Sequence, residues 1–362
     1  MTNKTYIIAE AGVNHNGDIA LAKQLVDAAV QAGADAVKFQ TFKADLLVTK
    51  DTPKAGYQAR NTGEDNGQYA MLKALELTEQ QHVELHHYCQ LQGIDFMSTP
   101  FDVKSMHFLL QFNMPFLKIP SGEVNNALLL WHAARTGLPI ILSTGMATLA
   151  DIEYALAVIL YGRHNPKLPT GLTEIFKFRS TLLAQGVTLE NIMLLHCTTQ
   201  YPTPLSDVNL KAIPHLNSTF GLPVGYSDHS DSVLVPALAV ANGAVCVEKH
   251  FTLSRSMKGP DHAASMEPDE LKQMIKMIRE TEVVQGRAIK FPQTYEFDTQ
   301  QIARQRLVTR TPIKCGESFT CDNVTTARSP RGLSAIHYWD LINTHAERDY
   351  NEMDAICMIA DQ

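Results

Sequence analysis

The segment "AVCVEKHF" (residues 244–251) begins as an apolar run and ends on a carboxylate, an amine and an imidazole. A short apolar run of this kind predicts a buried strand, yet removing an unpaired charge from water costs several kcal/mol. The preceding run, "PVGYSDH" (223–229), ends in the same way. Two consecutive buried strands that end on charged side chains predict a polar site at one edge of a sheet.

Six more runs of this kind occur earlier in the chain, and helix-length amphipathic segments separate the runs. The helical segments cover 18–32, 78–92, 124–136, 148–160, 230–242 and 268–285. The six runs are "YIIAEAG" (6–12), "AVKFQTF" (36–42), "DFMSTPF" (95–101), "FLKIPS" (116–121), "PIILSTG" (139–145) and "NIMLLHCT" (191–198).

Alternating strands and helices predict a parallel sheet. Eight such units in about 285 residues fit a closed (β/α)8 TIM barrel, for which roughly 250 residues are typical. An open, doubly wound sheet is the alternative, but it usually leaves a polar edge strand, and none of the eight runs has that character.

The pattern changes after the last helical segment. We expect a catalytic barrel over 1–287, a polar, extended linker over 288–298 and a small β-rich domain over 299–362. The connection 161–190 is unusually long, and the sequence assigns it no role.

Composition excludes several classes of protein. The chain has 362 residues, of which 45% are hydrophobic, and its apolar stretches are far too short to cross a membrane. The start of the chain does not resemble a signal peptide, and the six cysteines form no CxxC pair, so we expect a reduced, cytoplasmic protein. A net charge of −7 without a basic stripe argues against nucleic acid and anionic membranes as partners. An anionic ligand must therefore be held by a few local cations.

Side chains alternate between the two faces of a strand, so one choice of face per strand can point the polar strand ends inward together. Catalytic groups of barrels lie at this carboxyl end of the strands. The polar residues at or just after the strand ends are Glu10, Lys38, Thr99, Lys118, Ser143, Thr199, His229 and His250.

Two of these residues, His229 and His250, end strands that would be neighbours in a barrel. A single histidine there is more often a hydrogen-bonded core residue, but two predict a divalent metal site. We interpret Asp228 as orienting His229 from behind. In "SGEVNN" (121–126), Ser121 and free backbone N–H groups at a helix start suit a phosphate or carboxylate. By contrast, "HVELHH" (82–87) lacks the HExxH order and is predicted to be a solvated helix face.

This set of groups indicates a reaction class. Amines and hydroxyls suit a phosphorylated carboxylic acid, a metal with few protein ligands can activate a carbonyl, and a carboxylate can move protons. We therefore expect carbon–carbon bond formation between an anionic donor and an aldehyde. A Schiff-base aldolase using Lys118 or Lys38 is one alternative. A non-catalytic sugar- or ice-binding module is another, suggested only by the small C-terminal domain.

Motifs along nearly the whole chain resemble those of the bacterial sialic acid synthases and their legionaminic and pseudaminic acid relatives. They include "IIAEAGVNHNGD", "KIPSGEVNN", "LLHCTTQYPTP", "EKHFT" and "GPDHAASMEP". "ARSPRGLS" resembles a loop of the family's antifreeze-like (SAF) domain. The resemblance implies condensation of phosphoenolpyruvate with an open-chain N-acetylmannosamine-type sugar, giving a nine-carbon 2-keto acid and phosphate. A 2,4-diacetamido-6-deoxy hexose is the alternative acceptor.

The resemblance also implies residue roles. Glu10 would transfer protons, and His229 and His250 would hold Mn²⁺ or Mg²⁺. The implied phosphoenolpyruvate ligands are Lys38, Thr99, Lys118, Ser121, Ser143, Thr199 and Ser227. The implied sugar contacts are Gln40, Glu123, Tyr201, Asp261 and Arg328.

A domain-swapped homodimer is implied as well, with Arg328 acting on the neighbouring subunit. Two features depart from the family pattern at these sites. Thr199 stands where asparagine is usual, and the arginine loop reads "RSPRG", which makes Arg331 the alternative to Arg328.

Overall fold

A computed structural model describes residues 4–62 and 67–357 of the chain. The start of the predicted barrel domain (1–3), residues 63–66 within it and the end of the predicted small domain (358–362) lie outside these residues. The chain divides into two compact units, Met1–Gly286 and Arg287–Gln362, which are described separately.

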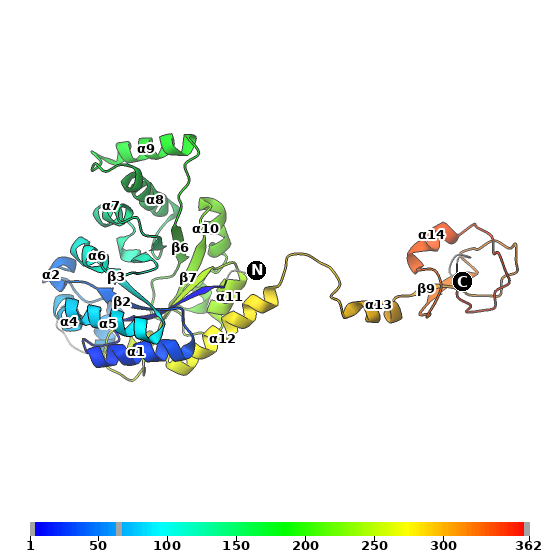
Figure 1. The fold of residues 1–362 in the computed structure, drawn as a ribbon, viewed down its shortest axis with the longest axis horizontal. Helices are drawn as coiled ribbons and strands as arrows, with labels where there is room; N and C mark the ends of the chain where they lie inside the picture. The colour runs from blue at the N-terminus through cyan, green and yellow to red at the C-terminus, as the bar shows by residue number, and fades with distance from the viewer. Residues whose placement is uncertain (1–3, 63–66, 358–362) are drawn as a thin grey trace. The chain divides into compact units, whose positions relative to one another are not determined.

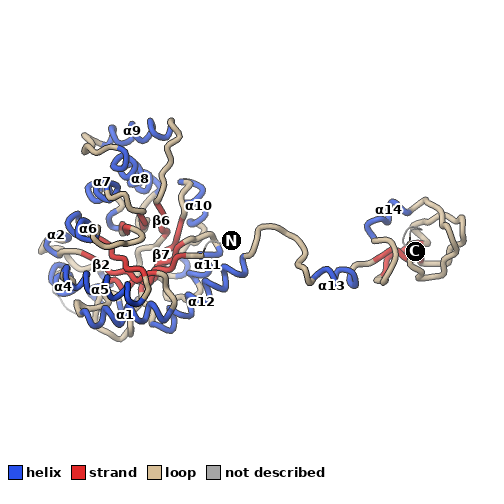
Figure 2. The backbone as a smooth tube through the Cα atoms, viewed as in Figure 1, coloured by secondary structure: helices blue, strands red, loops and turns tan. Residues whose placement is uncertain are grey.

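The first unit is an eight-stranded parallel barrel. The strands are hydrogen-bonded in the order β3-β2-β1-β8-β7-β6-β5-β4, and β3 and β4 also lie against each other. The ring is therefore nearly closed, with the strands inside a layer of helices (Figure 2). This order confirms the predicted barrel over the doubly wound alternative. The strands are β1 (Tyr6–Gly12), β2 (Ala36–Thr41), β3 (Asp95–Pro100), β4 (Leu117–Ile119), β5 (Ile140–Ser143), β6 (Ile192–His196), β7 (Val224–Asp228) and β8 (Cys246–His250).

Figure 1 shows the helices that surround the barrel. They begin and end on local signals in the sequence. Asp18 caps the first by accepting from the Ala20 N–H, and Gly33 ends it at φ 87°, a left-handed conformation that suits glycine. Thr78 and Thr148 each begin a helix with a capping box. The surrounding helices are α1 (Ile19–Ala32), α5 (Glu79–Gln92), α6 (Val103–Leu109), α7 (Ala127–Arg135), α8 (Leu149–His164), α10 (Ala212–Phe220), α11 (Val235–Ala241) and α12 (Pro268–Gln285).

Two insertions add to this ring. The long connection before β6 contains α9 (Leu172–Ala184), which packs on α8. The segment between β2 and α5 forms α2 (Ala44–Leu47), α3 (Gly56–Thr62) and α4 (Gln68–Leu75). The second insertion has a small apolar cluster of its own that includes Phe42, Met71 and Leu72.

The barrel interior has an apolar layer and, nearer the carboxyl ends of the strands, a polar layer. Its apolar layer consists of Ile8, Ala36, Met97, Ile141, Leu195 and Cys246. Two residues further along their strands come Glu10, Lys38, Thr99 and Ser143, which are also buried. The predicted alternation therefore holds, because residues two apart on a strand share a face.

His82, the first residue of "HVELHH", is buried, so the prediction of a solvated face is wrong there. Its ring nitrogens lie 2.8 Å from Thr41 Oγ1 and 2.9 Å from the Thr78 carbonyl oxygen. Because α5 packs against the barrel, its first turn turns this side chain toward the sheet.

The second unit has a core that includes Leu307, Phe319 and Tyr350. Its elements are α13 (Glu296–Ala303), the antiparallel pair β9 (Arg306–Thr309) and β10 (Val324–Ala327), and α14 (Tyr338–Leu341). The expected extended linker, 288–298, is wrong at its end, where α13 begins. Glu296, the first residue of that helix, accepts from the Gln293 N–H of the preceding turn at 2.6 Å.

The structure also bears on the cysteines and on membrane-spanning segments. All six cysteines, including Cys315, Cys321 and Cys357, are free thiols. Among the described residues, no helix is both long and apolar enough to cross a membrane.

Candidate active site

A cavity of about 800 Å³ opens at the carboxyl ends of the barrel strands, a volume typical of small-molecule sites. Arg328 belongs to the second unit, where its side chain is exposed. All other predicted site residues line the cavity: Glu10, Lys38, Gln40, Thr99, Lys118, Ser121, Glu123, Ser143, Thr199, Tyr201, Ser227, His229, His250 and Asp261.

Four buried charges form the floor of the cavity. Lys38 Nζ lies 2.7 Å from Glu10 Oε2 and 3.5 Å from Glu248 Oε2, and it donates to Thr99 Oγ1 at 2.9 Å. Lys118 Nζ donates to both oxygens of Glu248 at 2.7 Å. None of the four residues is more than 5% exposed. They tolerate burial because two carboxylates face two amines, so that each charge has a partner.

Glu248 is the one member of this floor that our sequence analysis did not assign to the site. Although burial alone would raise its pKa, Lys118 and Lys38 hold the pKa of Glu248 far below its ordinary value. Ser227 also donates to it at 2.9 Å. The signal was present in "VEKHFT", because Glu248 lies two residues before His250 on the same strand face. An anion that enters the cavity must therefore compete with the Glu248 carboxylate for Lys118 and Lys38.

Glu10 has a different electrostatic balance. Its pKa is raised to about 7, because burial raises it more than Lys38 lowers it, and the nearby Glu248 adds to the rise. Gln40 Nε2 donates weakly to Glu10 Oε1 at 3.4 Å. A carboxyl group that titrates near neutral pH is available in both forms, as general acid or base catalysis requires.

The two histidines lie close together at the ends of β7 and β8. Their ring centroids are 5.8 Å apart, and the ring of Tyr201 packs 4.1 Å from that of His229. His229 Nδ1 donates to the Thr198 carbonyl oxygen at 2.7 Å, which leaves Nε2 as the unprotonated nitrogen. His250 Nδ1 is buried without a hydrogen-bond partner. Burial lowers the pKa of both rings, so both are neutral at pH 7.

Two neutral imidazoles side by side fit a divalent metal. Within the described part of the chain, no group of three or more His, Cys, Asp or Glu side chains could hold one. The protein would therefore supply these two nitrogens and leave the other coordination positions to water and substrate.

Asp228 does not orient His229, which corrects our interpretation. Its carboxylate points to the other face of β7, where Lys249 donates to it at 2.7 Å and Tyr226 at 3.0 Å. Lys249 also donates to the Ser230 carbonyl oxygen. The physical reason is strand alternation, because Asp228 and Lys249 are paired in register on the outer face, while His250 points inward.

The hydroxyl groups of Ser121 and Thr199 lie close to the backbone of Gly145. The Gly145 N–H donates to Ser121 Oγ at 2.9 Å, on the short 3-10 helix η1 (Ser121–Glu123). A Cβ atom at Gly145 would lie 2.2 Å from Thr199 Oγ1 and 2.9 Å from Ser121 Oγ. Thr199 thus packs directly over the glycine, where a side chain would displace it.

Comparison with known proteins identifies the family of the chain. A model of the NeuB family matches residues 25–290. The chain belongs to the NeuB family. It is 44% identical to N,N'-diacetyllegionaminic acid synthase of Legionella pneumophila over 91% of this chain and 86% of that protein. It is 43% identical to the Campylobacter jejuni enzyme of the same name, over 98% of this chain and 99% of that protein.

A solved structure also resembles this NeuB-family chain in fold and sequence. N-acetylneuraminic acid synthetase from Leptospira borgpetersenii superposes with a TM-score of 0.66 at 32% identity. The match covers 82% of this chain and 90% of that one.

Proposed function

We propose that this NeuB-family chain condenses phosphoenolpyruvate with the open-chain form of an acetamido sugar. One carbon–carbon bond forms between C3 of phosphoenolpyruvate and the aldehyde carbon, one water is consumed, and phosphate leaves. The product is a nine-carbon 2-keto sugar acid. The observation that carries the proposal is the cavity floor, where two buried lysines and several hydroxyls lie next to a carboxyl group with a pKa near 7.

The acceptor that we favour is a 2,4-diacetamido-6-deoxy hexose, in place of the N-acetylmannosamine type. Two relatives more than 40% identical to this chain are named as N,N'-diacetyllegionaminic acid synthases, and that product carries two acetyl groups. A relative named as N-acetylneuraminate-9-phosphate synthase, from mouse, is 30% identical. Similarity therefore favours the diacetamido acceptor.

The predicted site residues that line the cavity have these roles in the proposal. Lys38 and Lys118 bind the phosphate and carboxylate of phosphoenolpyruvate, and the hydroxyls donate to the same anions: Thr99, Ser121, Ser143, Thr199 and Ser227. Gln40, Glu123, Tyr201 and Asp261 face the sugar. Glu10 gives a proton to, or takes one from, the reacting oxygen atoms.

We also propose that His229 and His250 hold a divalent metal, Mn²⁺ or Mg²⁺. When bound, this ion would supply Lewis-acid polarisation of the aldehyde carbonyl. Tyr201 keeps the His229 ring in place by packing against it.

Phosphate release tests the proposal directly. Purified protein with phosphoenolpyruvate should release phosphate with at least one of 2,4-diacetamido-2,4,6-trideoxymannose and N-acetylmannosamine. No release with either sugar, in the presence of Mn²⁺ or Mg²⁺, would contradict it.

Metal removal and borohydride separate the proposed mechanism from its rival. Protein made metal-free with EDTA, as checked by elemental analysis, should lose turnover and regain it when Mn²⁺ is added. Full turnover without metal would contradict the metal site. Borohydride added with the substrates should leave the protein mass unchanged, because the proposed mechanism forms no imine with the protein. A Schiff-base aldolase would instead gain the mass of a substrate trapped on a lysine.

A further inference from the structure

The two sides of the cavity differ in chemistry. One side presents Gln200, Tyr201, His229 and Asp261, and burial raises the pKa of Asp261 to about 6. Another part of the lining comes from the segment between β2 and α5, where six apolar side chains, called here the apolar wall, line the cavity together with Gln58, Arg60 and Gln68. The apolar wall consists of Phe42, Leu47, Val48, Met71, Leu72 and Leu75.

Part of the apolar wall is still open to a ligand. Phe42, Met71, Leu72 and Leu75 are already buried against one another. Leu47 and Val48 pack on this cluster but remain half-exposed, and both line the cavity. A ligand would gain most by covering these two side chains.

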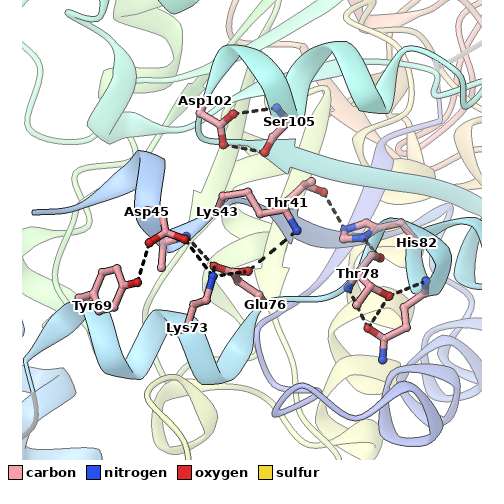
Figure 3. A network of polar contacts seen from close by, with 12 residues as sticks. Thr41, Lys43, Asp45, Tyr69, Lys73, Glu76, Thr78, His82, Asp102 and Ser105 are labelled. Atoms are coloured by element: carbon pink, nitrogen blue, oxygen red, sulfur yellow. Dashed lines mark hydrogen bonds and ion pairs between the residues drawn. The ribbon is translucent and has the colours of Figure 1, made fainter. Parts of the chain in front are cut away.

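A polar network on the outer side of the insertion fixes the apolar wall in place (Figure 3). Asp45 of α2 accepts from Tyr69 at 2.6 Å and from Lys73 at 3.0 Å, both on α4. Glu76, at the end of α4, accepts from the Ala44 N–H at 2.7 Å. These contacts tie α2 to α4, so the wall is preformed.

We propose that the apolar wall, chiefly Leu47 and Val48, binds the methyl group at C6 of the acceptor and selects 6-deoxy sugars over 6-hydroxy sugars. This inference rests on the proposed function. In this proposal the aldehyde reaches the charged floor and the far end of the open chain extends toward the insertion, whose side chains line the same cavity. Hydroxyl and amide groups can face the polar side, whereas a methyl group suits the wall.

The wall disfavours a hydroxyl group at C6 for a simple reason. A hydroxyl moved from water against the aliphatic side chains of Leu47 and Val48 loses hydrogen bonds that these two side chains cannot replace. A methyl group instead gains from leaving water. Apolar pockets discriminate between such pairs by roughly 10- to 100-fold in kcat/KM.

The test uses two acceptors that differ by one oxygen atom: 2,4-diacetamido-2,4,6-trideoxymannose and its 6-hydroxy counterpart, 2,4-diacetamido-2,4-dideoxymannose. The native protein should prefer the 6-deoxy sugar by roughly 10- to 100-fold in kcat/KM. Leu47→Asn, which keeps a similar shape, should lower that preference by about tenfold and leave the KM for phosphoenolpyruvate unchanged. Val48→Thr, which exchanges a methyl for a hydroxyl, should act in the same direction.

The neighbouring leucine provides a matched control. Leu46 lies on the same short helix but is 56% exposed and does not line the cavity, so Leu46→Asn should keep the native preference. Equal kcat/KM for the two sugars in the native protein would overturn this inference alone. An equal loss of preference in Leu46→Asn and Leu47→Asn would overturn it too. Phosphate release with N-acetylmannosamine alone would overturn this inference and leave the proposed function standing. No release with any of the three sugars would instead overturn the proposed function, and this inference with it.

Discussion

Glu10 is one of the four buried ionisable groups on the cavity floor. Its pKa of about 7 lets it exchange a proton at neutral pH. Glu10→Gln keeps the shape of the side chain and removes that exchange. We expect kcat to fall by about 10²–10⁴-fold, while calorimetry still detects phosphoenolpyruvate binding through Lys38 and Lys118. Glu153→Gln, on the surface of α8, is the matched control and should be fully active. A near-native kcat in Glu10→Gln would rule out the proton-transfer role.

Gly145 tests the anion site without removing any ligand. In Gly145→Ala, the new Cβ would collide with Thr199 Oγ1 and Ser121 Oγ, and both hydroxyls must then move. Misplacement by about 1 Å can cost about 10²-fold in rate, and we expect the KM for phosphoenolpyruvate to rise more than that for the sugar. Gly171 has open space around its α-carbon, so Gly171→Ala is the control. An unchanged KM for phosphoenolpyruvate would show that these hydroxyls do not bind it.

At the scale of elements, the insertion between β2 and α5 depends on Glu76. This carboxylate is the partner of the buried Ala44 N–H and also contacts Lys43 and Lys73. Glu76→Ala leaves that N–H without a partner and should lower the free energy of unfolding by roughly 1–3 kcal/mol in urea titrations. The KM for the sugar should rise with little change for phosphoenolpyruvate, because Lys38 and Lys118 lie on other elements.

Glu84→Ala is the control for this prediction, since it breaks only a surface ion pair with Lys23, and such pairs contribute little to stability. If Glu76→Ala and Glu84→Ala unfold at the same urea concentration, the network in Figure 3 does not hold the insertion in place.

At the scale of the whole molecule, we propose a domain-swapped homodimer in which Arg328 completes the site of the neighbouring subunit. Nine residues, 287–295, precede α13 and could span at most roughly 30 Å. We expect Glu10→Gln and Arg328→Ala each to lose activity alone, and mixing the two variants should restore activity after subunit exchange. The reason is that one of the two sites in each mixed dimer then holds both intact residues.

Two controls accompany this experiment. Each variant incubated alone should stay inactive, and Arg331→Ala should show whether the neighbouring arginine takes the role. If mixing restores no activity although subunit exchange is demonstrated, Arg328 acts within its own chain and the swap is wrong.

The sequence by itself determined the barrel and the inward direction of its polar strand ends. Apolar runs, their spacing and the two-residue alternation are local properties of the chain, so Glu10, Lys38 and His250 could be assigned to one face without coordinates. The same local rules did not predict α13, since a short polar helix has no apolar stripe to reveal it.

Only the tertiary structure decided which charges neutralise one another. Lys118 and Glu248 are 130 residues apart in sequence and meet across the barrel, while Asp228 turns to Lys249 instead of His229. The apolar wall likewise arises where α2 docks on α4. Side-chain pairing of this kind depends on strand register and on packing between distant segments, which the pattern of any one segment does not contain.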